Sequence, residues 1–102
     1  MDGKSRDYFE RKIRGLIREM EEEINSIEFQ IEESGWEPDI DYRRQVDELR
    51  LGLKEAEKAV KETAASSDAT WKIRYEEVEG NLKNLGNQLK SFRNRSRGFL
   101  LE

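Results

Sequence analysis

Residues 32–41, EESGWEPDID, interrupt a chain whose apolar residues otherwise recur with a helical period. Pro38, the only proline, cannot continue a helix because it lacks an amide hydrogen and its ring clashes with the preceding turn. Gly35 stands before it, where glycine favours the left-handed conformation that ends many helices. Asp39 or Asp41 is placed to accept hydrogen bonds from the free amides of a following helix. The stretch therefore predicts a turn between two helices.

Apolar residues on both sides of this turn alternate in spacing between four and three, which places them on one stripe of a helix. The first run is Ile13, Ile17, Met20, Ile24, Ile27 and Ile31. The second and third runs are Tyr42, Val46, Leu49, Leu53, Ala56, Val60 and Thr63, and then Trp71, Tyr75, Val78, Leu82, Leu85, Leu89 and Phe92. Disordered chains lack this periodicity, so the three runs predict three helices with a shared core.

A second break separates the last two runs. From Thr63 to Trp71 the chain advances eight residues, whereas one continuous heptad pattern requires seven or eleven. A turn fits this phase change better than a fused helix, and Ser66, Ser67 or Asp68 is placed to cap the third helix. We predict helices near 5–34, 40–65 and 68–96, followed by a short basic tail at 97–102.

Two short connections make neighbouring helices antiparallel. The fold class predicted is all-α, an up-down-up antiparallel three-helix bundle of coiled-coil-like character, in which residues 1–102 form a single helical domain. In chain length and helix count this architecture is similar to a spectrin-type repeat. No residue motif carries that likeness, so it implies the architecture alone.

Charge is unevenly distributed along the chain and supports this topology. Residues 19–41 contain ten acidic and no basic residues, and the bundle places them beside the basic end of the third helix. At the other end, we expect the basic residues between 4 and 18 to face acidic residues of the second and third helices, namely Glu55, Glu57, Glu62, Asp68, Glu76 and Glu77. Surface ion pairs contribute about 0.2–1 kcal/mol each, so they select the topology more than they add stability.

Composition argues against an enzyme. The chain has no histidine and no cysteine, which removes the commonest general base, the commonest transition-metal ligand and the best nucleophile. No glycine-rich phosphate-binding loop is present. The acidic run Glu21–Glu23 points mainly to solvent in the heptad register, which is the ordinary place for charge. We therefore expect no catalytic, cofactor-binding or metal-binding residues and no cofactor.

The net charge is −4, so the chain as a whole does not attract nucleic acid or anionic lipid. One basic segment, residues 90–99, carries the candidate anion-binding residues Lys90, Arg93, Arg95 and Arg97. They support an alternative function, binding of nucleic acid or of an anionic membrane surface. The first twelve residues lack the apolar segment of a secretory signal, and no run approaches the roughly 18 apolar residues of a membrane span. A cytoplasmic protein is expected.

Four apolar residues are candidates for contact with a partner. Phe29, Leu51 and Ile73 fall at position f of the heptad, which points away from the core when the apolar runs occupy positions a and d. Single exposed apolar residues are ordinary on protein surfaces, and the alternative is that one helix back packs against another protein or a second copy of this chain. Trp36 in the first turn is either a lid over the last core layer or an aromatic anchor for a partner. The sequence thus predicts a protein-interaction or structural module, with a homodimer as one form of it.

Overall fold

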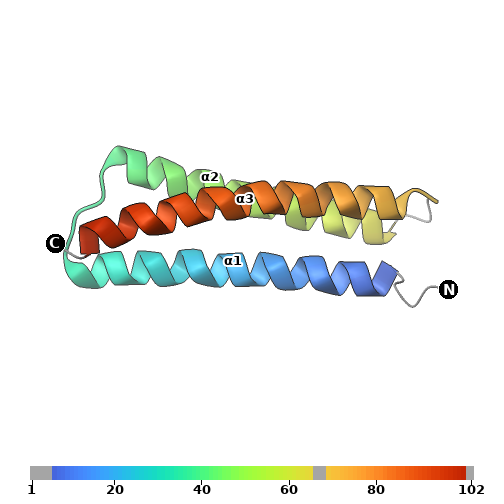
Figure 1. The fold of residues 1–102 in the computed structure, drawn as a ribbon, viewed down its shortest axis with the longest axis horizontal. Helices are drawn as coiled ribbons and strands as arrows, with labels where there is room; N and C mark the ends of the chain where they lie inside the picture. Colours follow the sequence, from blue (N-terminus) through green and yellow to red (C-terminus); the bar gives the residue numbers. More distant parts are fainter. Residues whose placement is uncertain (1–5, 66–68, 101–102) are drawn as a thin grey trace.

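The computed structural model describes residues 6–65 and 69–100, which form three helices: α1 (Arg6–Ser34), α2 (Ile40–Ala65) and α3 (Trp71–Leu100). α2 runs back along α1, and α3 returns beside both, so that α1 and α3 point the same way (Figure 1). Each helix packs against the other two, and the described residues contain no strand. The molecule measures 53 × 23 × 18 Å. The prediction of an all-α, up-down-up bundle of three helices is confirmed.

The helix ends agree with the sequence except in α3. α1 ends and α2 begins and ends at the predicted residues, whereas α3 begins at Trp71 and continues to Leu100. The predicted tail is therefore wrong for residues 97–100, which are helical. The apolar pattern ends at Phe92, and the next core position of the heptad is taken by the polar residue Ser96. Ser96 is nevertheless buried, with 2% of its surface exposed, so the core side of α3 extends beyond the apolar run. The predicted start at residue 68 lies outside the described residues.

Two small residues, Ser34 and Gly35, form the turn that ends α1. Gly35 adopts a φ of 79°, in the left-handed region, and its amide donates to the carbonyl of Glu32 at 3.2 Å. The Ser34 hydroxyl donates to the carbonyl of Ile31 at 2.7 Å and accepts from the amide of Trp36 at 3.1 Å. These bonds satisfy backbone groups that the end of α1 leaves without helical partners.

The start of α2 is capped by Asp39 rather than Asp41. The amide of Tyr42 donates to the Asp39 carboxylate at 2.8 Å, and the amide of Arg43 donates to the Asp39 carbonyl at 3.2 Å. At the start of α3 the amide of Arg74 donates to the carbonyl of Thr70 at 3.2 Å. The capping residues predicted there, 66–68, lie outside the described residues.

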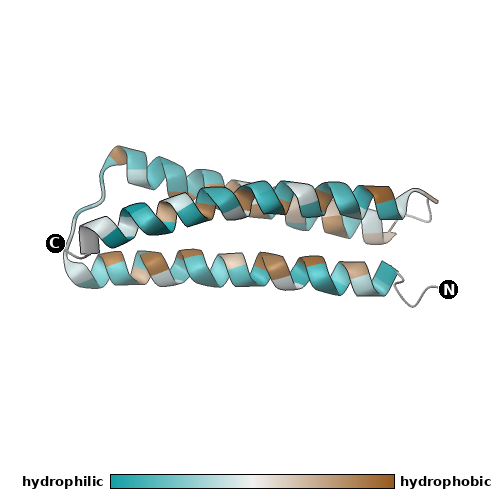
Figure 2. Ribbon diagram, in the orientation of Figure 1, coloured by the Kyte–Doolittle hydropathy of each residue, from teal (hydrophilic) through white to brown (hydrophobic). Residues whose placement is uncertain are grey.

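The core consists of the predicted heptad positions. Figure 2 shows the hydrophobic residues on the sides of the helices that face one another and the hydrophilic residues outside. Of the three predicted runs, Met20, Trp71 and Leu85 are partly buried, and every other member is buried. Burying an apolar side chain contributes about 1.5–3 kcal/mol, so this stripe is the main source of stability.

Aromatic residues close the core at both ends. At the first turn, the Tyr42 ring lies 5.1 Å from Phe92 and 5.5 Å from Trp36, measured between ring centroids. At the opposite end, Trp71 lies 5.9 Å from Phe9 and 6.0 Å from Tyr75. The rings pack at tilted or edge-to-face angles, the geometry that aromatic pairs favour. The aliphatic layers between the two ends are thus covered from water.

Candidate functional site

The three apolar residues predicted to point outward are exposed. The exposed fractions are 61% for Phe29, 57% for Leu51 and 58% for Ile73, one residue on each helix. Two further exposed apolar residues, Tyr8 and Ile40, were not singled out from the sequence. Tyr8 lies three heptads before Phe29, so the same register identifies it. The described surface therefore carries separate apolar residues on three helix backs, and the surroundings of each decide which is a candidate for binding.

The back of α1 is the most distinctive of these surfaces. We define the α1 outer face as the residues at heptad positions b, c and f between Arg11 and Glu33: Arg11, Lys12, Gly15, Arg18, Glu19, Glu22, Asn25, Ser26, Phe29, Glu32 and Glu33. All eleven residues are exposed. Positions b, c and f are opposite the core stripe, and most of their side chains reach neither α2 nor α3. The α1 outer face is therefore available to a partner along almost the whole helix.

Charge is divided sharply along α1. Residues 11–18 include four basic and no acidic residues, whereas residues 19–33 include seven acidic and no basic residues. Phe29 stands in the acidic half, with Asn25, Ser26, Glu32 and Glu33 around it at helical spacing. The large exposed ring is thus surrounded by polar and acidic groups.

Part of this charge is used inside the bundle. Glu23 pairs with Arg93 of α3 at 2.5 Å, Glu28 pairs with Arg50 of α2, and Lys12 pairs with Glu79 of α3. Glu79 was not among the six acidic residues predicted to face this basic segment, and its contact raises the pKa of Lys12 through a hydrogen bond and charge attraction. Other charges of the face stay outside these pairs. Within residues 6–65 and 69–100, no ion pair is formed by Arg18, Glu19, Glu22 or Glu33.

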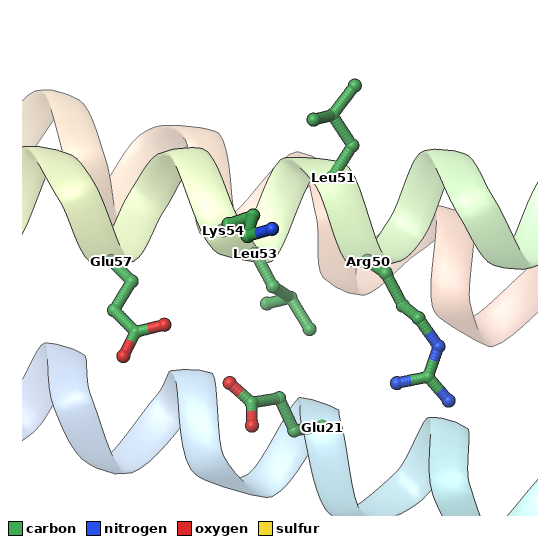
Figure 3. A pocket seen from close by; sticks show the side chains of 6 residues that line it. All are labelled: Glu21, Arg50, Leu51, Leu53, Lys54 and Glu57. Carbon is green, nitrogen blue, oxygen red and sulfur yellow. The ribbon is translucent and has the colours of Figure 1, made fainter.

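A groove between α1 and α2 has a volume of about 440 Å³ (Figure 3). Glu21 of α1 and Glu57 of α2 point into the space between the helices, and Leu51 points away from it. Arg50, Leu53 and Lys54 complete the lining. Only Leu53 of these residues is buried, so the groove lacks the apolar, enclosed character of a small-molecule pocket. Among the described residues there is also no group of three side chains suited to holding a metal ion.

Trp36 lies against the core. Its ring is half-buried, contacts the apolar cluster and meets Tyr42 edge to face. The position matches that of a lid over the last layer. Its use as an anchor for a partner stays a prediction that this packing does not favour.

The four basic residues predicted to bind anions do not form one patch of unpaired charge. Arg93 is held by Glu23, and Arg95 donates to the side chain of Gln45 at 3.4 Å. Lys90 and Arg97 are exposed on α3. Glu23 thus offsets the charge of Arg93, whereas the neutral side chain of Gln45 leaves the charge of Arg95 in place.

Comparisons with protein-family models, with curated proteins and with solved structures found no match for this chain. No helix in the described part of the chain is long and apolar enough to cross a membrane.

Proposed function

We propose that this chain is a non-enzymatic protein-interaction module that binds a partner through the α1 outer face. The observation that carries the proposal is Phe29, whose ring is 61% exposed in the body of α1 and lies on the side opposite the core. Burial of a phenylalanine side chain is worth about 1.5–3 kcal/mol, and aromatic residues are common among the side chains that dominate interfaces. The ring adds little to the stability of its own bundle and is available to an interface.

The surroundings of Phe29 favour it over the other two residues predicted to point outward, Leu51 and Ile73. Phe29 is the largest of the three predicted outward residues, and it stands on a face with a defined charge pattern. Leu51 borders the charged groove between α1 and α2, and Ile73 lies in the first turn of α3. A partner suited to the Phe29 region presents an apolar recess with basic side chains at its rim.

A protein partner is favoured over nucleic acid or an anionic membrane by the net charge of −4 and by the pairing of Arg93 with Glu23. Arg93 would otherwise contribute its charge to the alternative. The absence of histidine and cysteine supports the non-enzymatic part of the proposal.

Affinity capture from the native source with three tagged proteins tests the proposal: the unchanged chain, Phe29→Ser and Leu51→Ser. Leu51→Ser is the matched control, because it removes an exposed apolar side chain of similar exposure from another helix. We expect a protein that is retained by the unchanged chain and by Leu51→Ser and is lost with Phe29→Ser. Direct binding of that purified protein then confirms the contact. Loss with Leu51→Ser and retention with Phe29→Ser would place the binding surface on α2 and overturn the proposal.

A further inference from the structure

We infer that the partner of the α1 outer face is a second copy of this chain, packed antiparallel through the same face. The inference rests on the proposed function and adds the identity of the partner. Its basis is the spacing of the outward positions: Gly15 and Phe29 lie seven residues before and after Glu22. A two-fold axis at Glu22 therefore places each Phe29 opposite the partner's Gly15. Such a face is complementary to itself, as a two-fold dimer requires.

Gly15 provides the recess for the ring. It is exposed in the middle of α1, and a Cβ added there would meet no atom within 4 Å. Its own bundle gives no packing reason for glycine, which is unfavourable relative to alanine in a helix. A glycine opposite a phenylalanine leaves a notch in the helix surface, and the ring can enter this notch.

The charges that border the notch match those that border the ring. Residues at position b form one flank of the outer face, and residues at position c form the other. A two-fold axis that lies between the helices and is perpendicular to both brings each flank of one α1 against the same flank of the other. One flank then places Arg11 opposite the partner's Glu32, and the other flank places Lys12 opposite the partner's Glu33. Closer to the axis the same rule pairs Arg18 with the partner's Asn25 and Glu19 with the partner's Ser26. Opposite charges or polar groups thus face each other along both flanks.

A parallel arrangement lacks this complementarity. It would set four acidic residues of the outer face against the same four of the partner, namely Glu19, Glu22, Glu32 and Glu33, and like charges face to face are strongly unfavourable. In the antiparallel dimer only the two copies of Glu22 meet at the axis as like charges. The repulsion gives a distinctive expectation: Glu22→Gln should strengthen the dimer.

The dimer is expected to be weak. The segment from Arg11 to Glu33 spans about 33 Å at 1.5 Å per residue, and a single helix face of this length buries less area than the roughly 1,600 Å² of a standard interface. Association should therefore appear at high protein concentration and decline as salt screens the flanking pairs.

Sedimentation velocity with purified protein at low salt, from micromolar to millimolar concentration, tests the inference. We expect the unchanged chain to dimerise, and Arg11→Glu and Glu32→Arg each to weaken the dimer by about tenfold or more, because each places two like-charged pairs across the interface. An equimolar mixture of these two variants should recover a heterodimer, because acidic side chains then face basic ones at both sites. A mixture that stays monomeric, or an unchanged chain that stays monomeric at millimolar concentration, overturns the inference.

Gly15→Leu is the second variant, chosen so that a folding defect cannot imitate the effect. Leucine has better helix propensity and its Cβ meets no atom within 4 Å, so the variant should be at least as resistant to denaturant as the unchanged chain. It fills the notch and should weaken the dimer by about tenfold, the factor set by a loss of about 1.4 kcal/mol. Dimerisation equal to that of the unchanged chain would overturn the inference. A monomeric chain that still shows Phe29-dependent capture leaves the proposed function standing and removes only the second copy as partner.

Discussion

At the scale of single residues, Leu82 tests the position of the core. It is 1% exposed and lies in the middle of α3. Leu82→Ala should reduce the free energy of unfolding by about 2–5 kcal/mol, because truncation leaves a cavity that the surrounding helices cannot fill. Glu22→Ala, a change at an exposed residue, should alter it by less than about 0.5 kcal/mol. Denaturant melts of dilute protein measure both values, and equal losses would show that the core is assigned to the wrong stripe.

Ionisation of Tyr42 should lower the free energy of unfolding at alkaline pH. Burial raises the pKa of its hydroxyl to about 12, above the ordinary value of 10.0 that applies to the unfolded chain. Between these values the unfolded state releases the proton more readily, so the folded state loses stability as pH rises. The contribution is complete below pH 10 and is lost as pH rises through about 12.

Denaturant melts between about pH 9 and 12 measure this loss, with Tyr42→Phe as the control because it keeps the ring and removes the titrating group. The Tyr42 hydroxyl is buried and has no hydrogen-bond partner among the described residues, so its removal costs the fold little. We expect the free energy of unfolding to decline less steeply with pH in Tyr42→Phe. Identical pH profiles would contradict a buried Tyr42.

At the scale of the helices, Gly52 and Gly80 should respond differently to alanine. A Cβ on Gly80 would meet no atom within 4 Å, whereas one on Gly52 would lie 2.6 Å from Cδ2 of Leu85 in α3. Gly80→Ala should therefore stabilise the protein by about 1 kcal/mol through helix propensity alone. Gly52→Ala forces the tip of the partly buried Leu85 side chain to move, and this shift offsets part of the gain in helix propensity. Thermal melts should rank Gly80→Ala above the unchanged chain and Gly52→Ala below Gly80→Ala; the reverse order would mean that α2 and α3 do not approach at Gly52.

The ends of α1 and α2 at the first turn could be predicted from the sequence because the residues that end and start these helices act locally. Gly35 needs only its own φ to end a helix, and Asp39 acts on the amide three residues later. The end of α3 has no comparable marker. Ser96 is 2% exposed beside residues of α1, and a serine does not indicate a core position in the sequence. The apolar pattern therefore predicts a tail where the structure has helix.

The candidate site was predictable only in part for the same reason. The heptad register was enough to predict that Phe29 is exposed, since position f points away from any bundle core. The partner of Lys12 depends on how far α3 is displaced along α1, and the structure places Glu79 there, a residue outside the predicted acidic set. The role of Gly15 could not be predicted from the sequence either, because only the structure shows that the space around this glycine is open.

At the scale of the whole molecule, the charges of α1 have two uses. Those at the edges of the helix, such as Glu23 and Glu28, pair with α3 and α2 and favour the observed topology. Of those on the outer face, Lys12 pairs with Glu79 and Arg11 with Asp7, and the others form no ion pair among the described residues. The outer face is divided into a basic and an acidic half. The fold explains the first group, and the inferred dimer explains the second.

Two copies of this chain are expected to associate through the α1 outer face, while α2 and α3 serve the fold. Amide chemical shifts, followed by NMR as the purified protein is diluted from millimolar to micromolar concentration, show where this contact lies. The predicted result is a set of concentration-dependent shifts centred on Gly15, Glu22 and Phe29, with the outward residues of α2 and α3 unchanged. Shifts centred on Leu51 or Ile73 would instead place the contact on α2 or α3, and an absence of shifts at every concentration would rule out the dimer.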